Sequence, residues 1–449
     1  MDNTTDDVEG THALDWSPKQ SEALSAGDRW MRDPSAPQVM RLFGFAGTGK
    51  TTLAKHLADP TRWRFASYTG KAAHVMRQKG CDGATTIHSL IYRPAGESRS
   101  SEIALLTQRV EQLERKEHAL LLSPREADEL KMRRDQLAKA TSDNQPRFQL
   151  WANSPLADPS VDGIVIDECS MIDERLGRDL ESFGKKILVL GDPAQLPPVG
   201  AGGYFTNHEP DVMLTEIHRH ARESGILRLA TEIREGKSIH TWARRGAEPE
   251  IREWENAGCA DVIVRSRGQF DSQDLQTRVL SADQVLVGRN LTRKSANRRH
   301  RALLGRDGVA PMPGDRLVCL RNDRELGLFN GAQFTVSEAS CDVDSRTAEM
   351  KIVDEDGRQL AVSSWLHHMI GANHDEQRAL EKELTDMGPR RRDMAEFDYA
   401  YALTCHKSQG SQWPDVLVFD ESQAFGQDVG RRWLYTAVTR ASEKLTVIL

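Results

Sequence analysis

Short apolar runs recur along the chain and predict buried strands, the clearest being residues 39–43, 64–68, 161–166, 187–190 and 284–287. A helical pattern follows the first of these runs, at residues 52–58. Before that run, Ser17 and Pro18 are the residue types typical of a helix N-cap and first position, so we expect a helix to begin there.

Two stretches have a different pattern. Residues 101–140 place apolar side chains near a/d spacing amid dense charge, with a second helix start at residues 123–126, which predicts an antiparallel helical hairpin. It is either a structural or docking insert or an element that helps to split a duplex. Residues 311–364 contain apolar runs at 317–320, 333–336, 349–353 and 359–362 with Asn-Gly and Asp-Gly turn signals, which predicts a small inserted β-barrel.

Composition limits the class of protein. A chain of 449 residues is expected to form roughly two to four domains. No apolar run is long enough to span a bilayer, and the acidic N-terminus lacks the apolar stretch of a signal peptide, so we expect a cytoplasmic protein with a disordered lead at residues 1–12. The six cysteines are scattered, which argues against a zinc site. Because the net charge is −7, any nucleic-acid site must be a local groove.

The loop after the first strand has the sequence GFAGTGKT and fits the P-loop pattern G-x-x-x-x-G-K-[ST] at residues 44–51. Its glycines let backbone N–H groups converge on phosphate oxygens at a helix N-terminus. We expect Lys50 to reach the β- and γ-phosphates and Thr51 to hold Mg²⁺. The alternative is a glycine-rich turn that only joins strand to helix. The predicted nucleotide-binding residues are Gly44, Ala46, Gly47, Thr48, Gly49, Lys50, Thr51 and Thr52.

Two further loops follow predicted strands. Asp167 and Glu168 come directly after the run at 161–166, as in a Walker B motif. We expect Asp167 to coordinate Mg²⁺ and Glu168 to orient and deprotonate the attacking water. Residues 191–200 (GDPAQLPPVG) follow the next strand, and the amide of Gln195 is expected to contact the γ-phosphate or the lytic water.

Other polar residues have a functional and an ordinary interpretation. The amide of Gln20 can bind an adenine edge, although alone it reads as a solvated helix residue. The basic run at residues 289–301, which includes Asn290, forms either a phosphate track or a solvated helix face. Four residues after strands suit contacts to backbone phosphates but equally suit helix capping: Thr69, Lys71, Thr86 and His88.

The order of these segments resembles the RecD/Dda/Pif1 branch of superfamily 1 helicases. The resemblance rests on Gln20, GFAGTGKT, TGKAA at 69–73, DECS at 167–170 and GDPAQLPPVG. Residues 214–219 (LTEIHR), 401–411 (YALTCHKSQGS) and 435–441 (YTAVTRA) are similar to that group's motifs IV, V and VI. The similarity covers residues 14–449 apart from 95–150, and the chain is closest in size to phage Dda-like helicases.

The resemblance implies an α/β fold with two RecA-like P-loop domains, each a parallel sheet flanked by helices. The expected domains are 1A (13–94 and 151–208), a helical insertion 1B (95–150), 2A (209–310 and 370–449) and an SH3-like barrel 2B (311–369). In this family 1B is often a compact β-hairpin or wedge, so we assign the strand-separating pin to no residue here.

The resemblance also implies roles for individual residues. ATP would lie between the RecA-like domains, with Arg219 and Arg440 as arginine fingers from the second one. The implied catalytic residues are Lys50, Glu168, Gln195, Arg219 and Arg440. Gln20 and Gly410 join the nucleotide-binding residues, while Thr51 and Asp167 hold the metal. The implied DNA-binding residues are Thr69, Lys71, Thr86, His88, Asn290, Thr404, His406 and Ser411.

These features predict an ATP-dependent 5′→3′ DNA helicase of replication, repair or recombination, acting as a monomer in a bacterial or phage-infected cell without membrane contact. The direction rests on the resemblance alone. Expected partners are single-stranded DNA, forked or 5′-tailed duplexes, and single-strand-binding or replication proteins. One alternative is a single-strand translocase that displaces proteins and unwinds weakly. A catalytically silent DNA-binding module is the other, and the complete set of catalytic residues argues against it.

Overall fold

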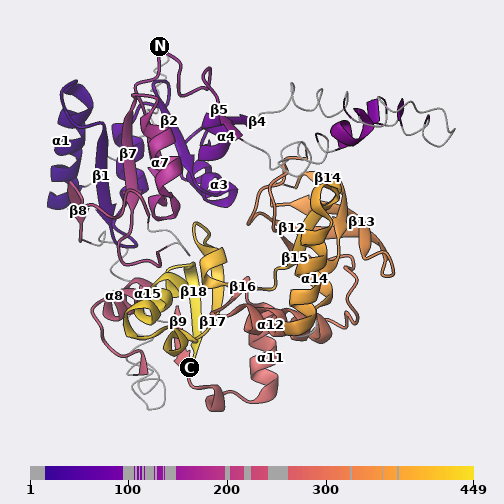
Figure 1. Ribbon diagram of the computed structural model, residues 1–449. Helices are drawn as coiled ribbons and strands as arrows, with labels where there is room; N and C mark the ends of the chain where they lie inside the picture. Colours follow the sequence, from indigo (N-terminus) through magenta and orange to yellow (C-terminus); the bar gives the residue numbers. More distant parts are fainter. Residues whose placement is uncertain are drawn as a thin grey trace, which may run out of the picture.

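The computed structural model describes residues 16–94, 148–197, 203–216, 224–240, 261–323, 326–355, 357–371 and 374–449, with scattered residues between 106 and 136. The described chain forms two parallel sheets and a closed barrel. In Figure 1 the first sheet lies at the upper left, the second below it, and the barrel to the right. The predicted α/β class with parallel sheets is confirmed.

The first sheet has the strand order β3-β2-β6-β7-β1-β8, with every pair parallel. Its central strands β1 (Val39–Gly44), β6 (Gly163–Asp167) and β7 (Lys186–Gly191) are almost fully buried, as expected for apolar strands covered by helices on both faces. Its other strands are β2 (Trp63–Ser67), β3 (Thr85–Thr86) and β8 (Val212–Leu214). Because β8 pairs with β1, the sheet extends past the predicted end of this domain at residue 208.

Helices and short elements surround this sheet. Ser17 caps α1 as predicted, and the capping box is completed by Gln20. The helices are α1 (Pro18–Arg32), α2 (Lys50–Leu57), α3 (Gly70–Gln78), α4 (Ile87–Ile91) and α7 (Glu174–Glu181), with a 3-10 turn, η1 (Cys169–Met171). A two-stranded ribbon, β4 (Tyr92–Pro94) and β5 (Phe148–Leu150), flanks the predicted insertion.

The second sheet has the order β16-β10-β17-β18-β9 and is also parallel throughout. Its strands are β9 (Val262–Arg265), β10 (Gln284–Val287), β16 (Ala402–Thr404), β17 (Trp413–Phe419) and β18 (Ala441–Ile448). Its helices are α8 (Gly225–Arg234), α11 (Ser272–Ser281), α12 (Asn290–Leu303) and α15 (Gln427–Val438), with 3-10 turns η3 (Arg267–Gln269), η5 (Cys405–Ser408) and η6 (Ser422–Phe425).

The barrel contains all four predicted strands and a fifth that lies outside the predicted range. The predicted four are β11 (Arg316–Cys319), β12 (Gln333–Asp342), β13 (Thr347–Asp354) and β14 (Gln359–Trp365). β15 (Ala395–Tyr399) closes the barrel by pairing with β11 and β14, so the predicted 2B range of 311–369 omits a strand. Between β14 and β15 lie α13 (His367–Ile370), α14 (His374–Asp386) and η4 (Gly388–Asp393).

The basic run on α12 is in part structural. The Arg293 guanidinium donates a 2.7 Å hydrogen bond to Asp398 of β15, and Arg301 forms an ion pair with Asp315 at 3.0 Å. All four side chains are nearly fully buried. Buried ion pairs of this kind join the second sheet to the barrel, so this part of the run forms neither a solvated face nor a phosphate track.

The predicted 1B hairpin lies largely outside the described residues. Of those described there, Val110, Leu113 and Leu130 pack together, and Arg109 hydrogen-bonds Glu129 at 2.8 Å. The hairpin itself stays a prediction. None of the helices in the described part of the chain has the length and apolar character that crossing a membrane requires.

Candidate functional site

The P-loop connects β1 to α2 and is held open by its own backbone geometry. Gly47 and Gly49 have φ angles of 76° and 81°, in the left-handed region that side chains disfavour. A Cβ on Gly44 would lie 2.6 Å from the Thr48 hydroxyl. The Lys50 ammonium donates to the carbonyls of Gly44 (2.7 Å) and Phe45 (3.1 Å), so it lies inside the curve of the loop.

The Walker B residues lie against this loop. The Thr51 hydroxyl donates to the Asp167 carboxylate at 2.9 Å, which brings together the two predicted metal ligands. Glu168, the next residue, has a φ of 55°, an unfavourable conformation for a side chain of this size and one that often marks a functional position. Burial raises the pKa of Glu168 above its usual value, and the nearby Arg440 guanidinium partly offsets this.

Gln20 reaches the P-loop from α1. It is buried, and its amide nitrogen donates to the Thr48 carbonyl at 3.0 Å while its amide oxygen accepts from the Ser17 N–H. The side chain therefore supports the P-loop rather than lying on a solvated helix face. Thr52, by contrast, is exposed on α2.

Arg440 comes from the second sheet and reaches the first. Its Nη1 lies 3.8 Å from Oε1 of Glu168, and the side chain is almost fully buried. Three further contacts orient the guanidinium: it donates to the carbonyls of Thr436 and Ser411 and to the Thr439 hydroxyl. Arg219, the other predicted finger, lies outside the described residues.

Gln195 lies in the loop after β7 and has an unusual environment. The side chain is 7% exposed, and its Oε1 is buried without a hydrogen-bond partner among the described residues. Buried acceptors are nearly always satisfied, so an acceptor without a partner in the loop after β7 is suited to a ligand or water. The end of the predicted motif, residues 198–200, lies outside the described part of the chain.

The second sheet also contacts the P-loop through α8, which sequence reasoning missed. The Arg234 guanidinium lies 3.8 Å from the centre of the Phe45 ring. A Cβ on Gly47 would lie 2.6 Å from Leu227. Leu227 and Arg234 lie on α8, just after the block at residues 214–219 that is similar to motif IV. The sequence signal for this contact was an arginine at the end of that helix.

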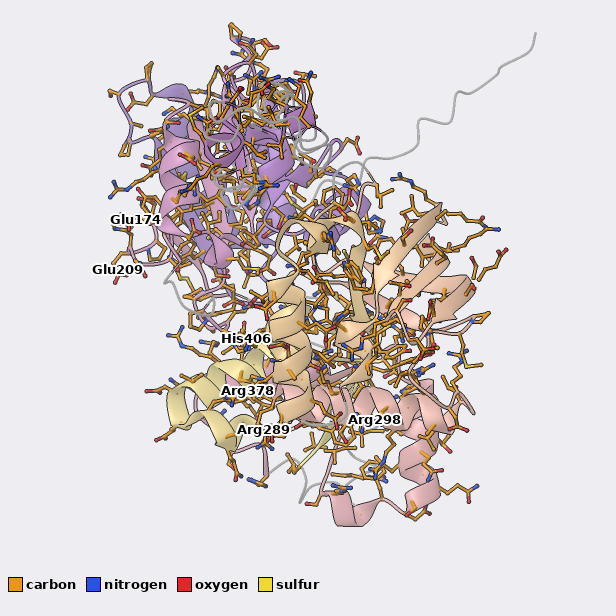
Figure 2. All side chains as sticks on the ribbon, turned by 45° about the vertical axis from the view of Figure 1, so that its right-hand side comes forward. Glu174, Glu209, Arg289, Arg298, Arg378 and His406 are labelled. Carbon is orange, nitrogen blue, oxygen red and sulfur yellow. The ribbon has the colours of Figure 1, made fainter. Side chains whose placement is uncertain are left out.

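A junction cavity of about 270 Å³ lies where the first sheet, the barrel and the segment after β16 meet. Four predicted DNA-binding residues line it: Thr69, Thr86, His88 and His406. Figure 2 shows His406 on the side of the second sheet that faces the first. The hydroxyls of Thr69 and Thr86 also cap α3 and α4, so their capping interpretation is confirmed while the cavity leaves their DNA role open. Sequence reasoning missed Phe329, Asn330 and Lys407 in the same lining.

The other predicted DNA-binding residues are placed differently. Lys71 is paired with Glu355 of the barrel, and its ammonium lies 5.1 Å from the centre of the Trp413 ring. Thr404 and Ser411 are buried, and Asn290 is exposed at the start of α12, away from the junction cavity. Gly410, predicted to bind nucleotide, lies close to Thr69 and Ala72 at the start of α3, and its nucleotide-binding role stays a prediction.

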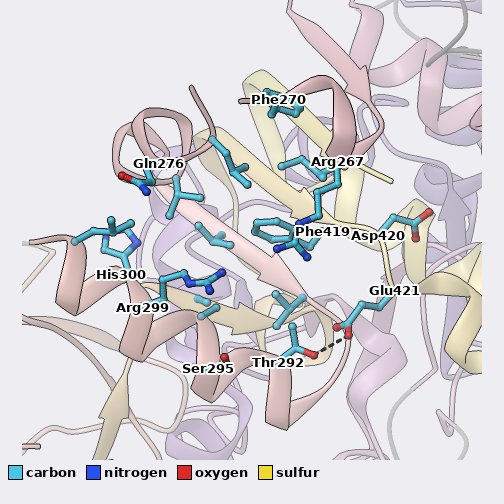
Figure 3. Close-up of a pocket in the computed structure, with 18 of the residues that line it drawn as sticks. Arg267, Phe270, Gln276, Thr292, Ser295, Arg299, His300, Phe419, Asp420 and Glu421 are labelled. Carbon is cyan, nitrogen blue, oxygen red and sulfur yellow. Dashed lines mark hydrogen bonds between the residues drawn. The ribbon is translucent and has the colours of Figure 1, made fainter. Parts of the chain in front are cut away.

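A larger cavity, about 770 Å³, lies between α11 and α12 over the second sheet and includes none of the predicted site residues. Figure 3 shows Arg267, Arg299 and His300 around its apolar floor, and the hydrogen bond from Thr292 to Glu421 at its edge. Within the described residues, no three His, Cys, Asp or Glu side chains gather as a metal-binding cluster.

Comparison with known proteins identifies the family. Residues 25–255, more than half of the chain, match a family described as "AAA domain". The chain belongs to this family. Residues 399–448 match the "UvrD-like helicase C-terminal domain". With the RecD relatives described next, these matches confirm the expected superfamily 1B helicase of the RecD type.

Two curated relatives extend the similarity. The ATP-dependent RecD2 DNA helicase of Deinococcus radiodurans is 25% identical over 98% of this chain and 51% of its own length. The RecBCD enzyme subunit RecD of Mycolicibacterium smegmatis is 24% identical over 64% of this chain and 50% of its own. The chain thus spans about half the length of the curated relatives it matches. Among solved structures, Bacteroides Pif1 bound to single-stranded DNA aligns over 97% of this chain and 92% of its own, with a TM-score of 0.49 and 14% identity.

Proposed function

We propose that the protein is an ATP-dependent DNA helicase. The observation that best supports this is the meeting of two half-sites. The first sheet supplies the P-loop and Glu168, and the second supplies Arg440, 3.8 Å from that carboxylate. A site divided between two sheets is expected to open and close with nucleotide state, which converts hydrolysis into relative motion of the two parts.

The residues fit Mg²⁺ and a triphosphate. The hydroxyl of Thr51 and the carboxylate of Asp167 are oxygen ligands, the kind that Mg²⁺ prefers. When bound, the metal would neutralise phosphate charge. Lys50 and the P-loop amides would bind the phosphates, Gln195 and Glu168 would orient the water, Glu168 would accept its proton, and Arg440 would stabilise charge on the γ-phosphate.

We propose that single-stranded DNA passes through the junction cavity. Threonine hydroxyls and Lys407 suit phosphate contacts, while His88, His406 and Phe329 offer rings for base stacking. The closed barrel would serve as the SH3-like 2B domain. Direction, 5′→3′, rests on the RecD/Pif1-type membership, and a monomer acting in the cytoplasm on forked or 5′-tailed duplexes, with single-strand-binding or replication proteins, remains part of the proposal.

The first test is ATP hydrolysis with and without single-stranded DNA. We expect strong stimulation by DNA, and Lys50→Ala should abolish hydrolysis while leaving DNA binding without nucleotide largely intact. Absent hydrolysis in the wild-type protein would leave only a DNA-binding module, whereas hydrolysis that DNA does not stimulate would leave an ATPase uncoupled from DNA.

The second test compares three duplexes of equal paired length, with a 5′ tail, a 3′ tail and blunt ends. We expect ATP-dependent unwinding of the 5′-tailed duplex alone. Preference for the 3′ tail would refute the direction and leave the ATPase standing. Poor unwinding of all three, with ATP-dependent displacement of streptavidin from a biotinylated single strand, would instead support the protein-displacing translocase.

A further inference from the structure

Tyr435 of α15 joins three parts of the nucleotide site through one hydroxyl. The hydroxyl donates to the Asp192 carboxylate at 2.7 Å and accepts from the Ala46 N–H of the P-loop at 2.9 Å. Tyr435 is 2% exposed and Asp192 is 4% exposed. The single phenol oxygen makes both hydrogen bonds: it donates its one proton to Asp192 and accepts the proton of the Ala46 N–H. Removing that oxygen therefore removes both contacts.

Asp192 in turn fixes the loop that carries Gln195. Its second carboxylate oxygen accepts from the Ala194 N–H at 2.9 Å, and its carbonyl accepts from the Gln195 N–H. The conformation of this loop therefore depends on Asp192, and Asp192 is bonded to the second sheet through Tyr435.

Two neighbours of Tyr435 on α15 bind the same loop. The Leu196 N–H donates to the Thr436 hydroxyl at 2.8 Å, and Arg432 donates to the Pro193 carbonyl at 3.0 Å. The Thr436 carbonyl accepts from Nε of Arg440 at 3.1 Å. A continuous set of hydrogen bonds thus leads from the P-loop through α15 to the guanidinium opposite Glu168.

We propose that Tyr435 is a positioning residue of the ATPase cycle, whose hydroxyl couples the P-loop and the Gln195 loop to α15 and Arg440 when the cleft is closed, with Arg440 opposite Glu168. The inference rests on the proposed function. The hydroxyl accepts from the N–H of Ala46, a residue predicted to bind nucleotide, so Tyr435 acts on the phosphates through the P-loop backbone. Through these hydrogen bonds, a movement of the P-loop on nucleotide binding shifts the Gln195 amide and the Arg440 guanidinium together. Without the hydroxyl, each sheet would respond to nucleotide separately.

The test uses Tyr435→Phe, which keeps the ring and removes both hydrogen bonds. Tyr401→Phe is the matched control, because Tyr401 is 3% exposed and also donates a 2.7 Å hydrogen bond to a buried carboxylate, that of Asp315, remote from the P-loop. We expect Tyr435→Phe to lower kcat of DNA-stimulated hydrolysis about 10-fold or more with little change in KM for ATP. A nonhydrolysable ATP analogue should no longer alter the affinity of this variant for single-stranded DNA.

The outcomes separate the inference from the proposed function. If the wild-type protein hydrolyses no ATP, the proposed function fails; if it does and Tyr435→Phe matches it in kcat and in nucleotide-dependent DNA affinity, the inference fails. Equal losses of kcat in Tyr401→Phe would indicate general destabilisation and also overturn it. Asp192→Asn changes the acceptor of the same Tyr435–Asp192 hydrogen bond. The double variant Tyr435→Phe/Asp192→Asn should therefore lose little more kcat than either single variant. Additive losses would contradict a shared role.

Discussion

The carboxylate of Glu168 and the guanidinium of Arg440 lie 3.8 Å apart, although the first residue follows β6 and the second precedes β18 of the other sheet. Burial raises the pKa of Glu168, and Arg440 opposes that rise. A general base must be deprotonated to accept a proton. Arg440 therefore has two effects on hydrolysis: it places positive charge in the cleft and keeps the proposed base ionised at lower pH.

Arg440→Gln should lower kcat by about 10³-fold, as for other arginine fingers, and should also change its pH dependence. The Glu168 pKa is already raised, so activity is lost as pH falls through it. Removing the opposing cation raises that pKa further, and the acid limb of the kcat profile should move to higher pH. Arg440→Lys, which retains the charge, should leave the limb near its original position. If the acid side of the kcat profile of Arg440→Gln lies at the same pH as in the wild type, the ionisation that limits activity there is not that of Glu168.

Glu168→Gln should bind ATP normally and hydrolyse it at least about 100-fold more slowly, the lower end of general-base contributions. Asp167 and Thr51 remain in place in this variant, so metal binding should persist. Glu174→Gln is the control, since that glutamate is exposed on α7 and pairs only with Arg178 among the described residues. Single-turnover hydrolysis and nucleotide binding distinguish the two steps. Normal turnover in Glu168→Gln would place the base elsewhere.

Local patterns sufficed for the nucleotide half-site of the first sheet. The P-loop and the Asp-Glu pair each follow a buried apolar strand, and parallel strands bring such loops to one edge. The structure places Lys50, Thr51, Asp167 and Glu168 there. Their catalytic roles stay predictions, as do those of the DNA-binding residues.

The missed features depend on partners far away in the sequence. β15 was not recognised because two of its residues are acidic, yet Glu396 is buried against Arg391 and Asp398 against Arg293. Hydrophobic periodicity cannot reveal a strand whose buried charges are paired across the fold. The basic run on α12 is likewise typical of an exposed surface in sequence, because the acidic partners of Arg293 and Arg301 lie outside that run. Phe329 lies in a loop of the barrel, so its place in the junction cavity depends on how the barrel packs.

Glu355→Gln should bind single-stranded DNA about 1.4- to 5-fold more tightly than the wild type, because Glu355 competes with phosphate for Lys71. The estimate follows from the modest strength of partly exposed ion pairs, about 0.2–1 kcal/mol. Fluorescence anisotropy with a labelled oligonucleotide at fixed salt measures it. Glu338→Gln removes the same charge from the barrel but from a pair with Lys351. Equal gains in both variants would show an effect of net charge alone.

Lys407 gives the junction cavity a pH dependence. Desolvation by the surrounding protein lowers the pKa of Lys407 to about 8, although the side chain is exposed on the surface; Arg293 adds to the shift and Asp398 opposes it. The ammonium is thus largely protonated at pH 7 and largely neutral at pH 9. A DNA phosphate beside Lys407 favours the protonated form, so binding takes up a proton wherever the free protein has lost it.

Affinity for single-stranded DNA should therefore fall as pH rises from 7 to 9 in the wild-type protein, and Lys407→Arg should remove most of that fall, because arginine stays charged throughout. Titrations of a labelled oligonucleotide at constant ionic strength, at several pH values, measure the slope. Lys351→Arg, at an exposed barrel lysine, controls for the substitution itself. An equal fall in wild type and Lys407→Arg would show that Lys407 lies off the DNA path, whereas a flat Lys407→Arg profile places its ammonium beside a phosphate.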